Sequence, residues 1–208
     1  MKLRRLGIGL LATGMTLTAL GCATGGYHST TPEEHAMWRA AEAGNLEAQR
    51  RVAVDLSPNS APEGARIDSG HAAFWYQEAC SQRYANAAVD FLRFAEYEEA
   101  RTRDSLYLSQ ALACLHSAIE QGHRAAIRAG ATRAAKSEKD FRRAYYLYAL
   151  LAKEDPAFAD RRWEIADQLI QGEPERIEER AAEWLSRNSL KGDDDFLREL
   201  SSSLSSRG

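Results

Sequence analysis

The residues best suited to chemistry are the histidines, the cysteines and a run of aspartates, and their spacing assembles no known reactive motif. No histidine lies in a His-Glu-x-x-His zinc motif, and no nucleophile-elbow or P-loop pattern is present. Asp193–Asp195 lacks the ligand spacing and the terminal glutamate of a calcium-binding EF-hand loop. The sequence therefore predicts no enzyme activity, no metal and no cofactor. The histidines considered are His28, His35, His71, His116 and His123.

The composition predicts helices throughout. The chain has 208 residues, enough for one domain or a tight array of repeats. It contains 36 alanines and only three valines. Alanine favours helices and β-branched residues favour strands, so we expect an all-α fold rather than a sandwich, a barrel or an α/β hydrolase.

The N-terminus has the organisation of a secretory signal. Met1–Arg5 is basic, Leu6–Leu20 is uncharged, and small residues precede Cys22. The uncharged run is too short for a comfortable membrane-spanning helix, which needs about 20 apolar residues. Removal of the signal would also remove the three basic residues of Met1–Arg5 and would change the net charge of the chain from −3 to −6. A chain this acidic is a poor candidate for binding nucleic acid.

The segment Ala19-Leu20-Gly21-Cys22 resembles the lipobox of bacterial lipoproteins, although that family more often has leucine where Ala19 stands. The resemblance implies that residues 1–21 are removed and that Cys22 carries acyl chains such as palmitate. Two or more acyl chains anchor a protein stably. Ala23 follows the cysteine where aspartate would favour the inner membrane, so the resemblance implies an outer-membrane anchor facing the periplasm. Residues 22–31 would form a tether. An ordinary secretory signal, with Cys22 incidental, is the alternative.

A nine-residue pattern recurs along the chain. Alanine occupies both ends of each copy, and the first three copies are 39 residues apart. Such self-similarity in a helical composition is typical of stacked hairpins, in which small residues lie where two helices approach closely. The central turn position reads Gly44, Arg83 and Gly122 in successive copies. The copies span Ala40–Ala48, Ala79–Ala87, Ala118–Ala126 and, less regularly, Ala149–Ala157.

Several helix boundaries can be predicted. Thr31-Pro32-Glu33-Glu34 is a capping box with proline at the first helical position. Residues 57–70 form a long loop, and Asp155-Pro156 separates two helices. A final helix, from Glu175 to about Arg187, would cap the array, and residues 189–208 would be a flexible tail.

These copies resemble Sel1-like repeats, which are relatives of tetratricopeptide repeats, over roughly residues 33–170. The chain departs from that family in its glycine-rich loop, kept only at Gly64–Asp68, and in Arg83, which replaces a turn glycine. The resemblance implies a right-handed α-solenoid over residues 32–188, and it gives His123 a packing or capping role. The matching positions are Ala72, Trp75, Tyr76, Ala79, Asn86 and Ala87 in one copy and Ala111, Ala118, Gly122, His123 and Ala126 in the next.

Cys80 and Cys114 fall in like helices of neighbouring repeats, five positions out of register. For helices stacked in register, that offset is ~7.5 Å along the axis, on top of ~9 Å between the axes. A disulfide needs Cα atoms within about 7 Å. Two free thiols are therefore favoured, although an extracytoplasmic chain also permits a disulfide.

Three arginines are the candidate binding residues. In the resembled fold, the helix after each turn lines the concave face, and counting from the shared alanines places Arg50, Arg93 and Arg128 there. This arginine stripe would suit an acidic peptide or an anionic polysaccharide. The alternative is that the arginines pair with nearby acids such as Glu47 and Glu96. The tryptophans (Trp38, Trp75, Trp163, Trp184) are expected in the core rather than on a sugar-stacking platform.

The sequence thus predicts an outer-membrane lipoprotein that acts as an interaction scaffold in an envelope complex, with a protein or polysaccharide partner. An enzyme or enzyme inhibitor acting on cell-wall material is the alternative. The sequence names neither the partner nor the oligomeric state.

Overall fold

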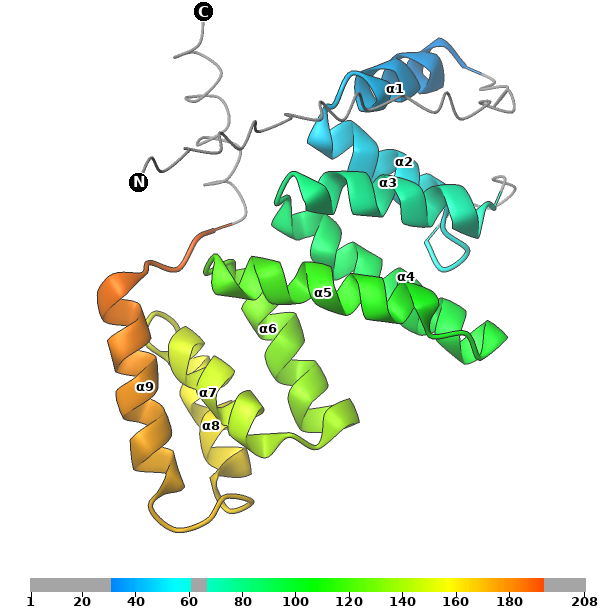
Figure 1. Ribbon diagram of the computed structural model, residues 1–208. Coiled ribbons are helices and arrows are strands. Elements are labelled where there is room, and N and C mark those ends of the chain that lie inside the picture. The colour runs from blue at the N-terminus through cyan, green and yellow to red at the C-terminus, as the bar shows by residue number, and fades with distance from the viewer. Residues whose placement is uncertain (1–30, 61–66, 193–208) are drawn as a thin grey trace, which may run out of the picture.

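The computed structural model describes residues 31–60 and 67–192 (Figure 1). Within these ranges the chain forms nine α-helices and no strand, which confirms the all-α prediction. The described ranges contain no helix that is both long and apolar enough to cross a membrane. The helices are α1 Pro32–Glu42, α2 Leu46–Leu56, α3 Ser69–Ser81, α4 Ala85–Thr102, α5 Leu106–Glu120, α6 Arg124–Arg133, α7 Phe141–Ala152, α8 Ala157–Ala166 and α9 Glu173–Arg187.

The predicted signal peptide (1–21), Cys22 and the predicted tether up to residue 30 lie outside the described residues, as does the tail from residue 193. Residues 61–66 of the long loop are also outside them.

Each alanine-bounded copy is the end of one helix, a turn and the start of the next, as predicted. The four copies join α1 to α2, α3 to α4, α5 to α6 and α7 to α8. In the first three, the central residue has a positive φ: 87° at Gly44, 65° at Arg83 and 83° at Gly122. Arg83 thus adopts the left-handed conformation for which the other two copies use glycine.

Because a non-glycine residue in this conformation costs of the order of 1 kcal/mol or more, Arg83→Gly should stabilise the fold by about 0.5–1 kcal/mol. Urea unfolding measures the change. Arg51→Gly, inside α2, is the control and should destabilise by about 0.5–1 kcal/mol. A destabilised Arg83→Gly variant would show that the arginine side chain contributes more than its backbone costs.

Side-chain caps fix where several helices begin. Thr31 and Glu34 form the predicted capping box at α1. The side chains of Asn45, Asp68 and Asp140 accept hydrogen bonds from backbone N–H groups of α2, α3 and α7. Such caps satisfy donors that the first turn of a helix leaves unpaired.

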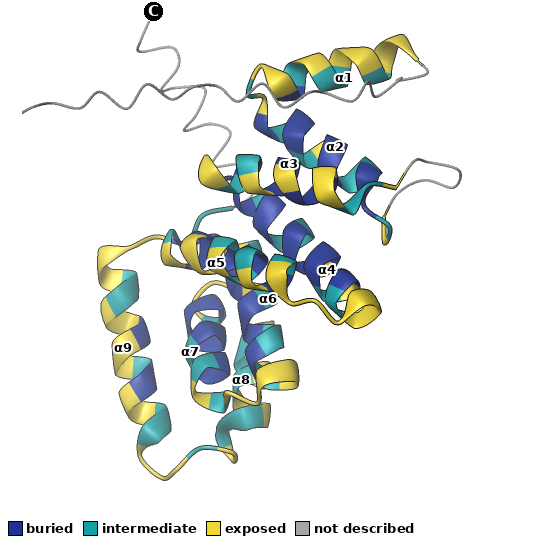
Figure 2. Cartoon of the chain, turned by 45° about the vertical axis from the view of Figure 1, so that its right-hand side comes forward, coloured by how far each residue is buried: buried dark blue, intermediate teal, exposed yellow. Residues whose placement is uncertain are grey.

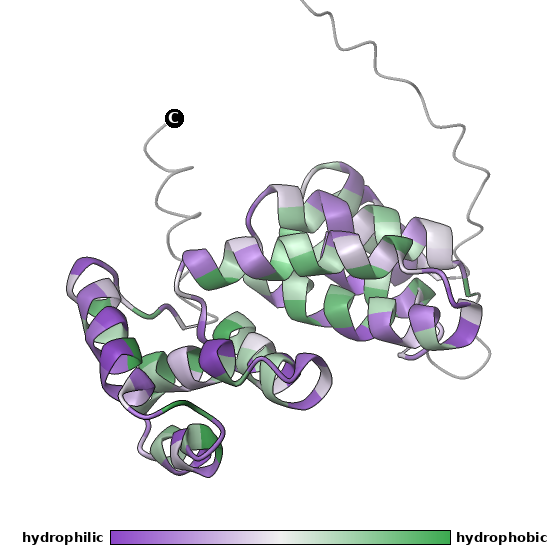
Figure 3. Cartoon of the chain, turned by 60° about the horizontal axis from the view of Figure 1, so that its bottom comes forward, coloured by the Kyte–Doolittle hydropathy of each residue, from purple (hydrophilic) through white to green (hydrophobic). Residues whose placement is uncertain are grey.

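The helices pack mainly against near neighbours in the chain. From α1 to α8 each helix contacts the next, and like helices of adjacent hairpins also touch: α3 with α5, α2 with α4, and α4 with α6. Buried residues face these contacts while the outer surfaces are exposed (Figure 2). Most helices accordingly carry both hydrophilic and hydrophobic residues (Figure 3).

The bulkiest part of the core is aromatic. Tyr76 of α3 stacks on Phe91 of α4 with ring centroids 5.3 Å apart, and Phe94 lies 5.7 Å from Tyr76. All three side chains are fully buried. Many of the remaining buried positions are alanines, which allow the helix backbones to approach closely.

The last helix and the segment after it close the described structure. α9 packs against α7 and starts two residues before the predicted Glu175. The chain then returns to the α5–α6 turn, where the Lys191 N–H donates to the Gly122 carbonyl (2.9 Å) and the Lys191 carbonyl accepts from the Arg124 N–H (3.1 Å). Leu190 is buried. The first residues of the predicted tail, 189–192, are therefore docked on the α5–α6 turn.

Gly122 has a second role at this docking point. A Cβ atom there would lie 2.6 Å from the Ser189 carbonyl oxygen, whereas a Cβ at Gly44 would meet nothing within 4 Å. Gly44→Ala should therefore cost only the backbone strain, about 1 kcal/mol. Gly122→Ala should cost about 1–3 kcal/mol more and should release residues 189–192. Unfolding and amide exchange at Lys191 measure the two effects, and equal losses in both variants would contradict the clash.

Candidate functional site

Arg50 of the predicted arginine stripe is held by two carboxylates. Its guanidinium lies 2.9 Å from Glu47 on the same helix and 2.5 Å from Asp90 on α4. The Tyr84 hydroxyl also donates to Glu47 (2.7 Å). The hydrogen bond from Arg50 holds the pKa of Glu47 below its ordinary value. Arg50 thus links two hairpins and is engaged before any partner arrives.

The other two members of the arginine stripe are more available. The side chain of Arg93 is 70% exposed and lies 3.6 Å from Asp90, which it shares with Arg50. Arg128 is exposed, with its guanidinium carbon 5.3 Å from the centre of the Phe158 ring. Ion pairing with nearby acids, the predicted alternative, therefore holds for Arg50 and, at the longer distance, for Arg93. Glu96 pairs with Arg133 instead.

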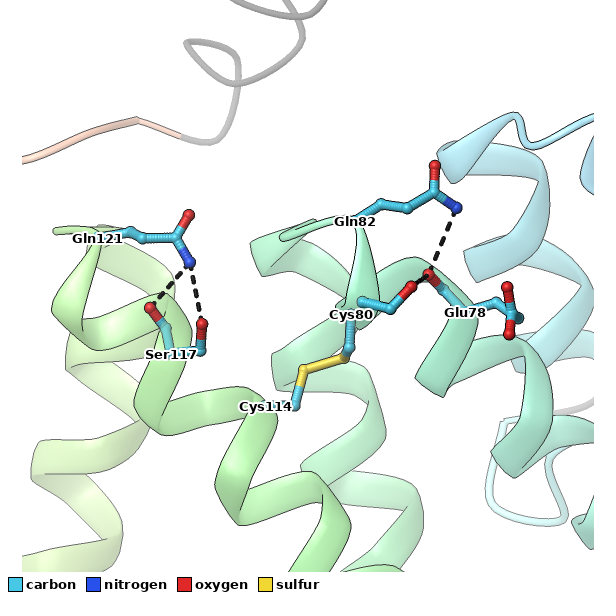
Figure 4. The surroundings of a disulfide bond; sticks show 7 residues. Glu78, Cys80, Gln82, Cys114, Ser117 and Gln121 are labelled. Atoms are coloured by element: carbon cyan, nitrogen blue, oxygen red, sulfur yellow. Dashed lines mark hydrogen bonds between the residues drawn. A yellow bond between two sulfur atoms is a disulfide. The ribbon is translucent and has the colours of Figure 1, made fainter. Parts of the chain in front are cut away.

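Cys80 and Cys114 form a disulfide, so the prediction of free thiols is wrong (Figure 4). Their Cα atoms are 5.8 Å apart, although the cysteines belong to different hairpins. The bond joins the last turn of α3 to the middle of α5.

The prediction failed because it assumed that α3 and α5 stack in register. Cross-helix contacts between them join residues separated by 33 or 34 positions, not 39. Gln77 donates to Gln110 (2.7 Å, separation 33), and the disulfide spans 34. The two helices are therefore staggered by about five residues, and this stagger cancels the ~7.5 Å axial offset expected from the repeat.

A pocket of about 670 Å³ lies between the first halves of α7 and α9, and we call it the α7–α9 pocket. Both helices begin at this pocket; Asp140 caps the start of α7, whereas the N–H-rich end of α9 has no side-chain cap and adds positive potential. It was not predicted from the sequence, because its two walls are about 30 residues apart in the chain. Its lining residues are Asp140, Arg142, Arg143, Tyr146, Glu173, Arg176, Ile177 and Arg180.

Two of the four arginines in the pocket have acidic partners. Arg142 lies 2.6 Å from Glu173, across the pocket, and Arg143 lies 3.6 Å from Glu138. A hydrogen bond from the Ile170 N–H, assisted by Arg142, lowers the pKa of Glu173.

The two arginines on α9 are held without a carboxylate. The Nε of Arg176 donates to the Gly172 carbonyl (3.1 Å), and the guanidinium of Arg180 lies 5.8 Å from the centre of the Tyr146 ring. Across the described parts of the chain, neither arginine forms an ion pair with an acidic residue.

A second groove, of about 510 Å³, lies where α8 and α9 flank α7. Alanines and Leu185 contribute much of its lining. At its edge, the Tyr145 hydroxyl donates to Glu178 (2.7 Å), and Arg162 lies 3.2 Å from the same carboxylate. Burial, together with the hydrogen bond to Glu178, raises the pKa of Tyr145 to about 12. These contacts fasten α9 to α7 and α8.

The remaining candidates are mostly structural. Trp75 is buried, and Trp38 and Trp184 are partly buried against the core, as predicted, but Trp163 is 59% exposed. His123 is buried. Among residues 31–60 and 67–192, no three histidine, cysteine, aspartate or glutamate side chains are grouped as metal ligands would be.

No protein-family model, curated protein or solved structure matches this chain. The candidate sites therefore rest on their own geometry.

Proposed function

We propose that the protein is a lipid-anchored interaction scaffold built as a right-handed α-solenoid of Sel1-like hairpins. It is held by acylated Cys22 on the periplasmic face of the outer membrane. It presents the exposed members of the arginine stripe, Arg93 and Arg128, to an acidic protein segment or an anionic polysaccharide of the envelope.

One observation supports the scaffold proposal: the second helices of the first three hairpins are joined by ion pairs. Arg50 of α2 binds Asp90 of α4 over 40 positions, and Glu96 of α4 binds Arg133 of α6 over 37. Direct links between successive hairpins are what a solenoid needs, because each hairpin is stabilised chiefly by its neighbours. A stack of this kind offers an extended surface for a partner.

A charge reversal tests the scaffold. Arg50 is unsuitable because it is structural, so the variant is Arg93→Glu/Arg128→Glu. The control is Arg39→Glu/Arg51→Glu, two exposed arginines outside the stripe. Envelope proteins and polysaccharides bound to each full-length variant are cross-linked, captured and quantified. The first variant should lose a component that the wild type and the control retain. Identical captured sets would exclude the arginine stripe as the binding surface.

The lipid anchor has a separate test. Wild-type cells grown with radioactive palmitate should label the protein, and the label should disappear in Cys22→Ser. The variant should also leave the membrane fraction. Labelling that survives the substitution, or a signal segment cleaved at another bond, would contradict lipid attachment at Cys22.

A further inference from the structure

We propose that the α7–α9 pocket binds an extended acidic peptide segment whose carboxylates alternate along the chain, with Arg176 and Arg180 as the principal contacts. This site is separate from the arginine stripe and does not depend on it.

The pocket carries a surplus of positive charge. The pocket is lined by four arginines and two acids in a chain whose formal net charge is −3. Glu138, which pairs with Arg143 from outside the lining, reduces the local surplus to one positive charge, and the N-terminal end of α9 adds to it. An anion is therefore the ligand that the pocket attracts most strongly.

The two α9 arginines are positioned to bind separate carboxylates. Arg176 and Arg180 are four residues apart and so lie on the same side of the helix, where like charges repel. Each is nevertheless held in place, one by the Gly172 carbonyl and the other by the Tyr146 ring. Bound carboxylates would relieve the repulsion and occupy guanidinium groups that are already oriented.

The spacing of the two arginines matches an extended acidic peptide. Four residues of helix rise about 6 Å, and alternate side chains of an extended peptide are about 6.7 Å apart on one side. Successive carboxylates of an alternating acidic segment thus match the spacing of Arg176 and Arg180. A phosphate group concentrates its charge at one point, whereas the arginines here are spread over two helices whose starts also bring Asp140 and Glu173 into the lining. Separated single charges suit this arrangement better.

The test measures binding of three fluorescein-labelled peptides to the full chain by anisotropy at low ionic strength. One peptide alternates glutamate and serine, one alternates glutamine and serine, and one has the first composition with all glutamates in one block. The alternating acidic peptide should bind most tightly, and the glutamine peptide should not bind. Equal binding of the alternating and blocked peptides would overturn the spacing argument.

Two variants of the pocket and one control assign the site. Arg176→Gln/Arg180→Gln should weaken binding about tenfold or more, whereas Arg39→Gln/Arg51→Gln should leave it unchanged. Glu173→Gln removes a carboxylate that competes for Arg142 and should strengthen binding a few-fold. Thermal melts establish that each variant is folded. This gain of binding tests the proposal even if the double variant unfolds, because loss of structure cannot produce it.

Competition with inorganic phosphate identifies the class of ligand that the pocket binds. Inorganic phosphate should displace the alternating peptide no better than chloride at the same ionic strength. Stronger displacement by phosphate would show a phosphate site and overturn the peptide proposal. Equal binding to the double variant and the wild type would exclude the pocket without bearing on the arginine stripe.

Discussion

Replacing Cys80 and Cys114 together by serine should lower the free energy of unfolding by about 3–4 kcal/mol. The bond closes a loop with a sequence separation of 34 residues, and constraining an unfolded loop of that length contributes about that much. Because the bond ties α3 to α5, the loss should appear at the interface between the second and third hairpins. Urea unfolding, with amide exchange in α3 and α5, measures both effects.

Cys22, the third cysteine of the chain, should be replaced by serine in every variant compared. Cys80 and Cys114 are then the only cysteines that a reductant can affect. A reductant should then destabilise the parent chain by a similar amount and leave the double variant unchanged. A reductant effect in the double variant, or none in the parent, would contradict a structural disulfide.

Phe91→Ala should cost about 3–5 kcal/mol, because it removes a fully buried ring at the centre of the aromatic core. The cavity would lie between Tyr76 of α3 and Phe94, which both stack on Phe91. For a chain of this size, each kcal/mol lowers the melting temperature by about 2–4 °C, so a loss of roughly 10 °C is expected.

Phe74→Ala provides the matched control for Phe91→Ala. Phe74 is also on α3, but its side chain is 43% exposed. It should cost about 1 kcal/mol or less, since most of its apolar surface already meets water. Comparable losses in the two variants would mean that the aromatic core does not dominate stability in this part of the fold.

The local features of the fold were predictable because local sequence determines them. Alanine at the ends of each copy, with glycine at the turn, placed the hairpins, and Thr31 with Glu34 placed the start of α1. Arg83 shows that the turn conformation persists where its usual residue is absent. These signals lie within about ten residues of the structure that they specify.

The relations between hairpins were not predictable in the same way. The repeat gives the sequence shift between equivalent positions, but helix packing decides how far like helices slide past one another. The Cys80–Cys114 bond depends on that slide. Asp90, the second partner of Arg50, likewise lies 40 residues away and approaches only when α2 and α4 are packed.

Part of the candidate site could be predicted from the sequence, and part could not. The four-residue spacing of Arg176 and Arg180 can be read on the predicted last helix, but their pocket exists only because α9 lies beside α7. Exposed Trp163 was predicted in the core because its surroundings are rich in alanine and leucine. However, α8 has no buried residue, since few helices contact it besides α7.

The two backbone hydrogen bonds at Lys191 also determine how the molecule would carry a mechanical load. A force applied on the C-terminal side of Lys191 is transmitted directly to residues 122–124 through these bonds. Helices α7, α8 and α9 therefore carry no load until the bonds break. The three helices are then loaded all at once. In an open array, by contrast, force strips terminal repeats one after another. Fastening Lys191 to an interior turn therefore protects the last third of the described structure from unfolding one helix at a time.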